Sequence, residues 1–167
     1  KIQGAQINVW GIGTKLVTAF DQPALGGVYK LAALKNEAGT WDYKIKLSEQ
    51  AIKVSTPGIQ QVRRYKQEGG FVADMIFDVV HSLKTDIKMI DPYDFTRNRT
   101  FSKDMDYEDL LVPVFDRGIL VYQLPSIHES KIRVQNQLKS LHSGIKRFVN
   151  PHTYPVGLEN TLFDIKT

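Results

Sequence analysis

Apolar and polar residues alternate strictly over residues 41–47 (WDYKIKL). A period of two residues is typical of a strand that has one face in water. The apolar stretch at residues 28–35 precedes this strand, and residues 36–40 (NEAGT) between the two favour a tight turn. The pattern therefore predicts a β-hairpin over residues 28–47.

Two further hairpins are predicted from the same order of apolar runs and turn residues. Their strands are expected at residues 59–66 and 71–78, and at residues 110–115 and 119–124. The turns between them are residues 67–70 (QEGG) and 116–118 (DRG). Pro113 has no N–H to donate to a ladder, so its strand is expected at an edge or a bulge. Residues 91–94 and 96–109 are polar and are predicted to be loops.

One longer helix is predicted over residues 126–149. Ser126 and Glu129 have the spacing of a capping box, in which each side chain binds the backbone N–H of the other residue. Apolar residues then recur in steps of three and four, which gives the helix one apolar face: Val134, Leu138, Leu141, Ile145 and Phe148. Gly144 is a point where this helix can divide. Pro151 ends it, and the tail beyond is expected to be irregular.

A glycine-rich turn lies near the start of the chain. The apolar run 7–10 predicts a buried strand, Gly11 and Gly13 follow it, and residues 15–22 predict a short helix. In α/β barrels this order often places a phosphate on main-chain N–H groups at the positive end of the helix. The Thr14 hydroxyl would add one more donor. The spacing alone fits a tight turn without a ligand equally well.

The composition is that of a globular protein. Of the 167 residues 42% are hydrophobic and 24% are charged, and no apolar run approaches the roughly 20 residues of a membrane span. The lack of cysteine excludes disulfides, thiolate catalysis and cysteine-ligated zinc, and it fits a reducing cytoplasm. The net charge of +4 comes from scattered residues without a block of five like charges, which favours a solvated surface over a nucleic-acid footprint.

Other candidates for chemistry have simpler explanations. Leu16 stands where a dinucleotide fingerprint needs its third glycine, and no G-x-S-x-G elbow is present. The histidines show no metal-binding spacing and are expected at the surface or in caps: His81, His128, His142 and His152. A cluster of acidic residues has the chemistry to hold Mg²⁺, but a solvated loop before a strand explains it more simply: Asp104, Asp106, Glu108 and Asp109.

Four stretches of the chain resemble one enzyme family. They are WGIGTKLVTAFDQPALGGVYKLAAL (10–34), KLSEQAIKVSTPGIQQVRRY (46–65), LLVPVFDRGILVYQLPSI (110–127) and RFVNPHTYPVGLENTLF (147–163). In this order they resemble the C-terminal part of the nicotinate phosphoribosyltransferases. The resemblance implies an α+β fold, a fragment of an α/β-barrel type II phosphoribosyltransferase. It also implies three parts: a final barrel strand–loop–helix unit (1–25), a β-hairpin segment (26–84) and a C-terminal α+β domain (85–167).

The resemblance also implies an activity. Members of this family join nicotinate and 5-phosphoribosyl 1-diphosphate to give nicotinate mononucleotide and diphosphate. They couple this step of NAD salvage to ATP hydrolysis through a phosphorylated histidine, use Mg²⁺, and work as cytoplasmic homodimers; no nucleic-acid or membrane partner is implied. The alternative hypothesis is a non-catalytic β-rich module that binds a phosphorylated ligand or a protein partner.

The resemblance assigns roles to a few residues. Gly13 and Thr14 match the family positions that hold the 5′-phosphate of the phosphoribosyl donor, and Gly11 shapes the turn. Pro23, Gly26 and Gly27 match a structural P-x-x-G-G corner. No histidine of this chain matches the phosphorylated one, and no metal ligand is assigned. We therefore expect a fragment that carries one wall of an active site but no catalytic residue, and that is inactive by itself.

Overall fold

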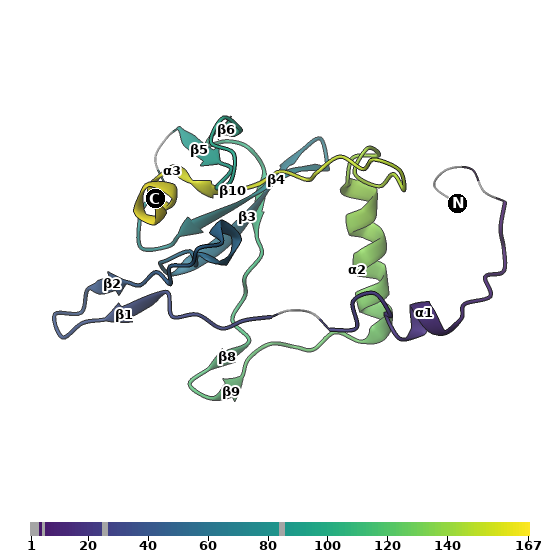
Figure 1. Cartoon of the computed structure of the whole chain (residues 1–167), viewed down its shortest axis with the longest axis horizontal. Coiled ribbons are helices and arrows are strands. Elements are labelled where there is room, and N and C mark those ends of the chain that lie inside the picture. The colour runs from purple at the N-terminus through teal and green to yellow at the C-terminus, as the bar shows by residue number, and fades with distance from the viewer. Residues whose placement is uncertain (1–3, 5, 25–26, 84–85) are drawn as a thin grey trace. The chain divides into compact units, whose positions relative to one another are not determined.

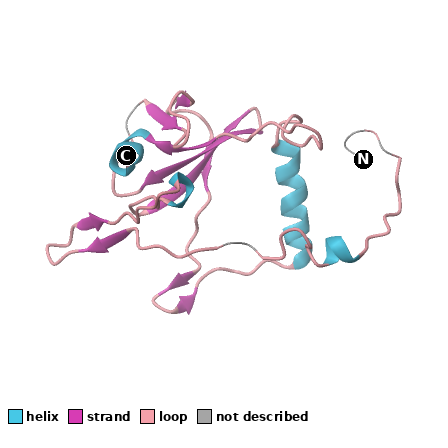
Figure 2. Cartoon of the chain, viewed as in Figure 1, coloured by secondary structure: helices cyan, strands magenta, loops and turns pink. Residues whose placement is uncertain are grey.

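The computed structural model describes residues 4, 6–24, 27–83 and 86–167. The chain divides into two units, Lys1–Lys30 and Leu31–Thr167. Figure 1 shows the path of the chain through both units, and Figure 2 shows that strands make up most of the regular structure of the second. The expected boundaries at 25/26 and 84/85 fall on residues outside the described ones and stay predictions.

The second unit is organised around one mixed sheet of six strands. The strands, in spatial order, are β6 (Asn98–Phe101), β5 (Ile87–Ile90), β10 (Val156–Glu159), β4 (Gly70–Asp78), β3 (Gln60–Gln67) and β7 (Tyr107–Asp109). Strand β10 is parallel to β4, and every other neighbouring pair is antiparallel. With helices α2 (Ile127–Ser140) and α3 (Asn160–Lys166), this makes the unit a mixed α+β fold, as expected.

The core of the sheet comes from alternate residues of neighbouring strands. On β4, Ala73, Met75 and Phe77 point to one face and are buried. Tyr65 of β3 and Phe101 of β6 stack on each other in this cluster, with ring centroids 3.9 Å apart and planes 8° apart. The alternation that predicted the β3–β4 hairpin thus also selects the residues that form the core.

All three predicted hairpins are confirmed, two of them with shorter strands. The strands of the short ones are β1 (Ala33–Lys35) with β2 (Trp41–Tyr43), and β8 (Phe115–Asp116) with β9 (Ile119–Leu120). A 3₁₀ turn, η1 (Ala51–Lys53), follows the first pair. The β8–β9 turn places Arg117 and Gly118 at φ values of 47° and 82°. These positive values are those of the turn type that matches the twist of two strands, and they favour glycine.

The capping box is confirmed, but the helix behind it is shorter than predicted. The Ser126 hydroxyl accepts from the Glu129 N–H at 3.2 Å, and the Glu129 carboxylate accepts from the Ser126 N–H at 2.6 Å. Helix α2 ends at Ser140, because Leu141 takes an extended conformation and the chain turns at residues 142–146. The Lys146 ammonium donates to the Leu138 carbonyl at 2.7 Å and satisfies one free end of the helix.

Two predictions for the second half of the chain are wrong. Residues 96–109 are not all loop, because β6 and β7 lie within this stretch. The tail is not irregular either, because it forms β10 in the middle of the sheet and then α3. These strands have three or four residues each, and such short segments become strands only where longer neighbours offer backbone partners.

The strand predicted at residues 7–10 is also wrong. The structure describes this stretch without strand pairing, and Val9 and Trp10 are exposed. A strand needs a neighbour to take its hydrogen bonds, and the described part of the first unit offers none. The helix predicted at residues 15–22 is present as α1 (Thr14–Val17), which begins one residue before the predicted start and is shorter than predicted. Ala19, with a φ of 47°, lies just beyond its end.

We predict that Gly157→Ala destabilises the sheet. A Cβ at position 157 would lie 2.7 Å from the carbonyl oxygen of Ile90, an atom held in the neighbouring strand β5. Overpacking of this kind costs about 1–3 kcal/mol, to be measured by urea unfolding. Gly70→Ala is the matched control, because its nearest contact would be an ordinary 3.4 Å. Equal stability of the two variants would contradict the prediction.

Candidate functional site

The glycine-rich turn leads directly into helix α1. Gly13 is the N-cap residue, with extended backbone (φ −103°, ψ −168°) and no side chain that caps the helix. The first helical bond runs from the Val17 N–H to the Gly13 carbonyl at 3.3 Å. The N–H groups of the first turn have no acceptor within the helix. They are free to bind an anion placed at its N-terminal end.

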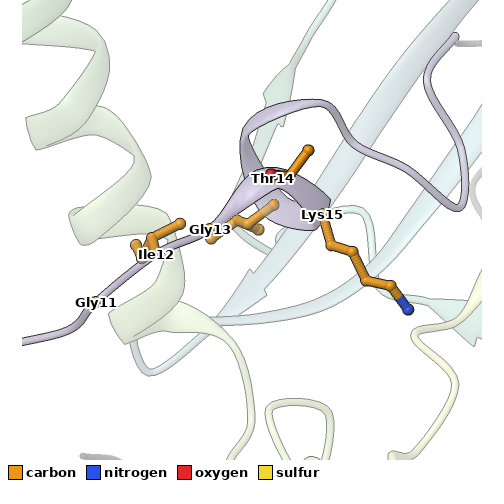
Figure 3. Close-up of a pocket in the computed structure, with 6 residues that line it drawn as sticks. Gly11, Ile12, Gly13, Thr14 and Lys15 are labelled. Atoms are coloured by element: carbon orange, nitrogen blue, oxygen red, sulfur yellow. The ribbon is translucent and has the colours of Figure 1, made fainter.

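A shallow hollow of about 430 Å³ lies along this turn and is lined by residues 11–16 (Figure 3). Among the described residues, a Cβ at Gly11 or Gly13 would meet no atom within 4 Å, and neither φ is positive. The described fold therefore does not itself require glycine at these two positions.

Of the side chains that line the hollow, Thr14 and Lys15 are polar or basic, and Ile12 and Leu16 are apolar. Thr14, the first residue of α1, is exposed, and Lys15 extends away from Gly11–Gly13 with its ammonium 5.3 Å from the centre of the Phe20 ring (Figure 3). The Thr18 hydroxyl donates to the Thr14 carbonyl at 2.7 Å. The structure thus brings together Gly11, Gly13 and Thr14, all three residues that the sequence analysis selected. Gly26 of the expected corner lies outside the described residues, so that part stays a prediction.

Two of the four residues of the acidic cluster form ion pairs across the sheet. Asp109 accepts from two nitrogens of Arg63 at 2.7 and 2.9 Å, and Glu108 pairs with Lys66 at 2.9 Å. The hydrogen bond from Lys66 lowers the pKa of the Glu108 carboxyl. Glu108 and Asp109 belong to strand β7, whereas Asp104 and Asp106 lie in the exposed loop before it, as the simpler expectation has it. Among the described residues, no group of three or more metal-binding side chains comes together.

Two histidines that are ten residues apart meet at the turn after α2. The rings of His142 and His152 stack with centroids 6.2 Å apart. The Gly144 N–H donates to His142 Nδ1 at 3.1 Å, and a Cβ at Gly144 would lie 2.4 Å from His152 Nδ1. No local pattern predicts this pair, because the spacing of the two histidines matches no helix, strand or metal motif. Its contacts shape a turn.

A buried carboxylate joins the first hairpin to the sheet. Asp78, at the end of β4, is 2% exposed and accepts from the Tyr43 hydroxyl and, at 2.9 Å, from the Val80 N–H. The Tyr43 oxygen also lies 3.2 Å from His81 Nε2. Burial, and then the hydrogen bond to Asp78, raise the pKa of Tyr43 to about 12. The cluster is a structural link between β2 and β4.

Comparisons with known proteins identify the fold. A family model described as the nicotinate phosphoribosyltransferase C-terminal domain matches residues 60–166, which include the whole six-stranded sheet. The second unit therefore contains a phosphoribosyltransferase C-terminal domain. The chain belongs to the nicotinate phosphoribosyltransferase family, and the resemblance found in its motifs is confirmed.

Individual relatives agree with this assignment. The chain is 38% identical to the nicotinate phosphoribosyltransferase of Bacillus subtilis, over 99% of this chain and 34% of the relative. It is 31% identical to that of Dictyostelium discoideum, over 97% of this chain and 28% of the relative. The chain thus spans about a third of the length of these curated relatives.

A solved structure supports the fold. The crystal structure of human nicotinic acid phosphoribosyltransferase superimposes with a TM-score of 0.57 at 24% identity. The superposition covers 66% of this chain and 23% of the human one. Separately, no helix in the described part of the chain is long and apolar enough to cross a membrane.

We predict that Tyr43 makes stability fall at high pH. Its pKa of about 12 in the folded state lies above the ordinary tyrosine value of 10.0, so its contribution to stability is complete below pH 10.0 and disappears as the pH rises to about 12. Tyr43→Phe should therefore be less stable at neutral pH and lose less stability over this range, as measured by urea unfolding.

Tyr29→Phe is the control, because Tyr29 is fully exposed. It should show the same alkaline loss of stability as the unaltered chain. A Tyr43→Phe variant that follows the unaltered chain through the whole alkaline range would contradict the role given to the Tyr43–Asp78 bond.

Proposed function

We propose that the chain supplies the C-terminal portion of a nicotinate phosphoribosyltransferase, which joins nicotinate to 5-phosphoribosyl 1-diphosphate. The observation that carries this proposal is the match of nearly the whole chain, glycine-rich turn included, to enzymes of that name. By the family resemblance alone, the proposal extends to ATP and Mg²⁺ as cofactors, and to a homodimer in the cytoplasm.

Within that enzyme, we propose that the turn Gly11–Thr14 holds the 5′-phosphate of the phosphoribosyl donor. Free N–H groups at the start of α1 and the positive end of its dipole suit an anion. The Thr14 hydroxyl is a further donor. Because the described residues leave the space beside Gly13 open, the ligand itself is the reason for glycine: a side chain there would occupy the volume that the anion needs.

The remaining parts of the reaction would come from elsewhere in the full-length enzyme. Joining two substrates depends on holding both in place and on stabilising the charge that develops between them. We assign one part of the active site to this chain, the phosphate-binding turn. The groups that bind nicotinate and that react would lie in the two thirds of the relatives' length that the chain does not span.

We predict that the purified 167-residue chain alone forms no nicotinate mononucleotide from nicotinate, 5-phosphoribosyl 1-diphosphate and ATP. The reason is that one wall cannot position both substrates. Product can be measured by mass spectrometry, with the Bacillus subtilis relative as the positive control. Turnover by the isolated chain at a rate near that of the relative would contradict the prediction.

We predict that Thr14→Ala in the full-length enzyme weakens use of the phosphoribosyl donor. Loss of a hydrogen bond to a charged group costs about 1.5–3 kcal/mol. The KM for 5-phosphoribosyl 1-diphosphate should therefore rise about ten- to hundred-fold, while the KM for nicotinate changes less. Gly13→Val should have a larger effect, because its side chain would obstruct the anion directly.

Two controls separate binding from folding. Thr18→Ala removes a hydroxyl at the C-cap of the same helix, which does not line the hollow, and it should leave the donor KM within about twofold. Gly13→Val should leave the urea unfolding of the 167-residue chain unchanged, because position 13 has open space and ordinary φ. Unchanged kinetics of Thr14→Ala would mean that the turn holds no phosphate.

A further inference from the structure

Between β7 and β10 the chain leaves the sheet and returns to it. Its departure is fixed by Gln61, whose side chain donates to the Leu111 carbonyl at 3.0 Å and accepts from the Leu111 N–H at 2.9 Å. Its return is fixed beside the β3–β4 turn, where Ser140 and Leu141 line a hollow together with Gly70. We call residues 112–139, which contain the β8–β9 hairpin and nearly all of α2, the arm.

The arm has no core of its own. Its residues are exposed except Tyr122 and Gln137, which are half-buried, and α2 contains no buried residue. The exposed large apolar residues of the arm are Val112, Val114, Phe115, Ile119, Leu120, Val121, Leu124, Ile127, Ile132, Val134 and Leu138. Exposed large apolar residues gathered in one segment mark a site of contact with another protein surface. A two-stranded hairpin is also only marginally stable without such cover.

On α2 three of the four large apolar residues form a stripe, and Ile132 lies on another face. Ile127, Val134 and Leu138 are spaced seven and four residues apart, so they lie on one face of the helix. They are 87%, 57% and 43% exposed. A narrow stripe with this spacing fits the groove of another helix or the seam between two.

The charges beside the stripe argue against a second copy of the arm as the partner. Helix α2 carries three basic residues, Lys131, Arg133 and Lys139, against one acidic residue, Glu129. Lys131 lies on the face of the stripe, four residues after Ile127, so two copies packed stripe to stripe would bring two Lys131 ammonium groups together, which is unfavourable. An apolar surface with an acidic rim is the complementary partner.

The length of the relatives indicates where such a surface comes from. The chain matches 34% of the Bacillus subtilis relative and 28% of the Dictyostelium discoideum one, and its sheet matches the C-terminal domain of the family. We infer that the arm docks on the upstream two thirds of a nicotinate phosphoribosyltransferase polypeptide, with the β8–β9 hairpin and the α2 stripe as its contacts. This inference rests on the family assignment and not on the proposed activity.

The experiment compares amide hydrogen exchange in two proteins. One is the 167-residue chain, and the other carries the same chain in place of the last third of the Bacillus subtilis relative. Exchange over residues 112–139 should be fast in the isolated chain and at least tenfold slower in the joined protein. Residues 60–78 of the sheet should be protected in both.

Charged variants test whether apolar contacts of the arm cause its slow amide exchange in the joined protein. In the joined protein, Phe115→Asp with Ile119→Asp should restore fast exchange in the arm and leave the sheet protected, because both side chains are exposed in the isolated chain. Leu47→Asp is the matched control, since Leu47 is 79% exposed and lies outside the arm. It should leave the exchange of the arm slow.

Three results would overturn the inference. One is fast exchange of the arm in a joined protein whose sheet is folded. Another is slow exchange that the two aspartates do not change. A third is protection of the arm in the isolated chain that increases with protein concentration, which would identify a second copy as the partner.

If the sheet of the joined protein does not fold, amide exchange is measured in the intact Bacillus subtilis enzyme instead. Slow exchange in its segment aligned with residues 112–139 supports the inference, and fast exchange overturns it. Enzyme activity is not a readout here. A protected arm in an inactive protein would therefore count against the proposed function alone.

Discussion

The position of β10 between β4 and β5 is the constraint on which the rest of the sheet depends. This strand lies within the last twelve residues of the chain, yet it is hydrogen-bonded on both sides and its Leu158 is 2% exposed. Gly157 allows the backbone of β5 to approach closely. The Glu159 carboxylate then accepts from the Thr161 and Leu162 N–H groups and starts α3. The sheet is therefore completed only when the C-terminal residues are in place.

A second network fixes the point at which the chain enters β10. Asp74 on β4 accepts from two nitrogens of Arg64 at 2.8 and 2.7 Å, and from the Tyr154 hydroxyl at 2.9 Å. Burial, and then the hydrogen bond to Asp74, raise the pKa of Tyr154. The carboxylate is thus paired and hydrogen-bonded, as a largely buried charge must be. Tyr154 lies two residues before β10, so this contact sets where the returning chain joins the sheet.

The strand order also explains why the arm exists. Strand β7 lies at one edge of the sheet, whereas β10, the next strand of that sheet along the chain, lies near its middle. The connection must therefore leave the sheet after Leu111 and return to the interior. The apolar residues of the arm are therefore not covered by the sheet.

The sequence predicts those features of the fold that depend on residues close together in the chain. The turns at residues 67–70 and 116–118 and the cap at Ser126 depend on a few neighbouring residues, so their chemistry is visible in the sequence. Strands β5, β6, β7 and β10 are short and owe their structure to partners that are distant along the chain. The strand expected at 7–10 shows the same limit, because an apolar run without a partner among the described residues stays unpaired.

The candidate site shows the same contrast between local patterns and contacts of distant residues. Gly11, Gly13 and Thr14 are consecutive or nearly so, and their order is informative without any knowledge of the fold. The pairing of Asp109 with Arg63, and of Tyr43 with Asp78, joins residues 46 and 35 positions apart. No local pattern predicts contacts over such distances.

The most direct test of the proposed function is the product formed by the joined protein, in which this chain replaces the last third of the Bacillus subtilis relative. Mass spectrometry after incubation with nicotinate, 5-phosphoribosyl 1-diphosphate and ATP measures nicotinate mononucleotide. We expect product from the joined protein, as from the relative itself. A joined protein with a folded sheet that forms no product, while the relative does, would contradict the proposal.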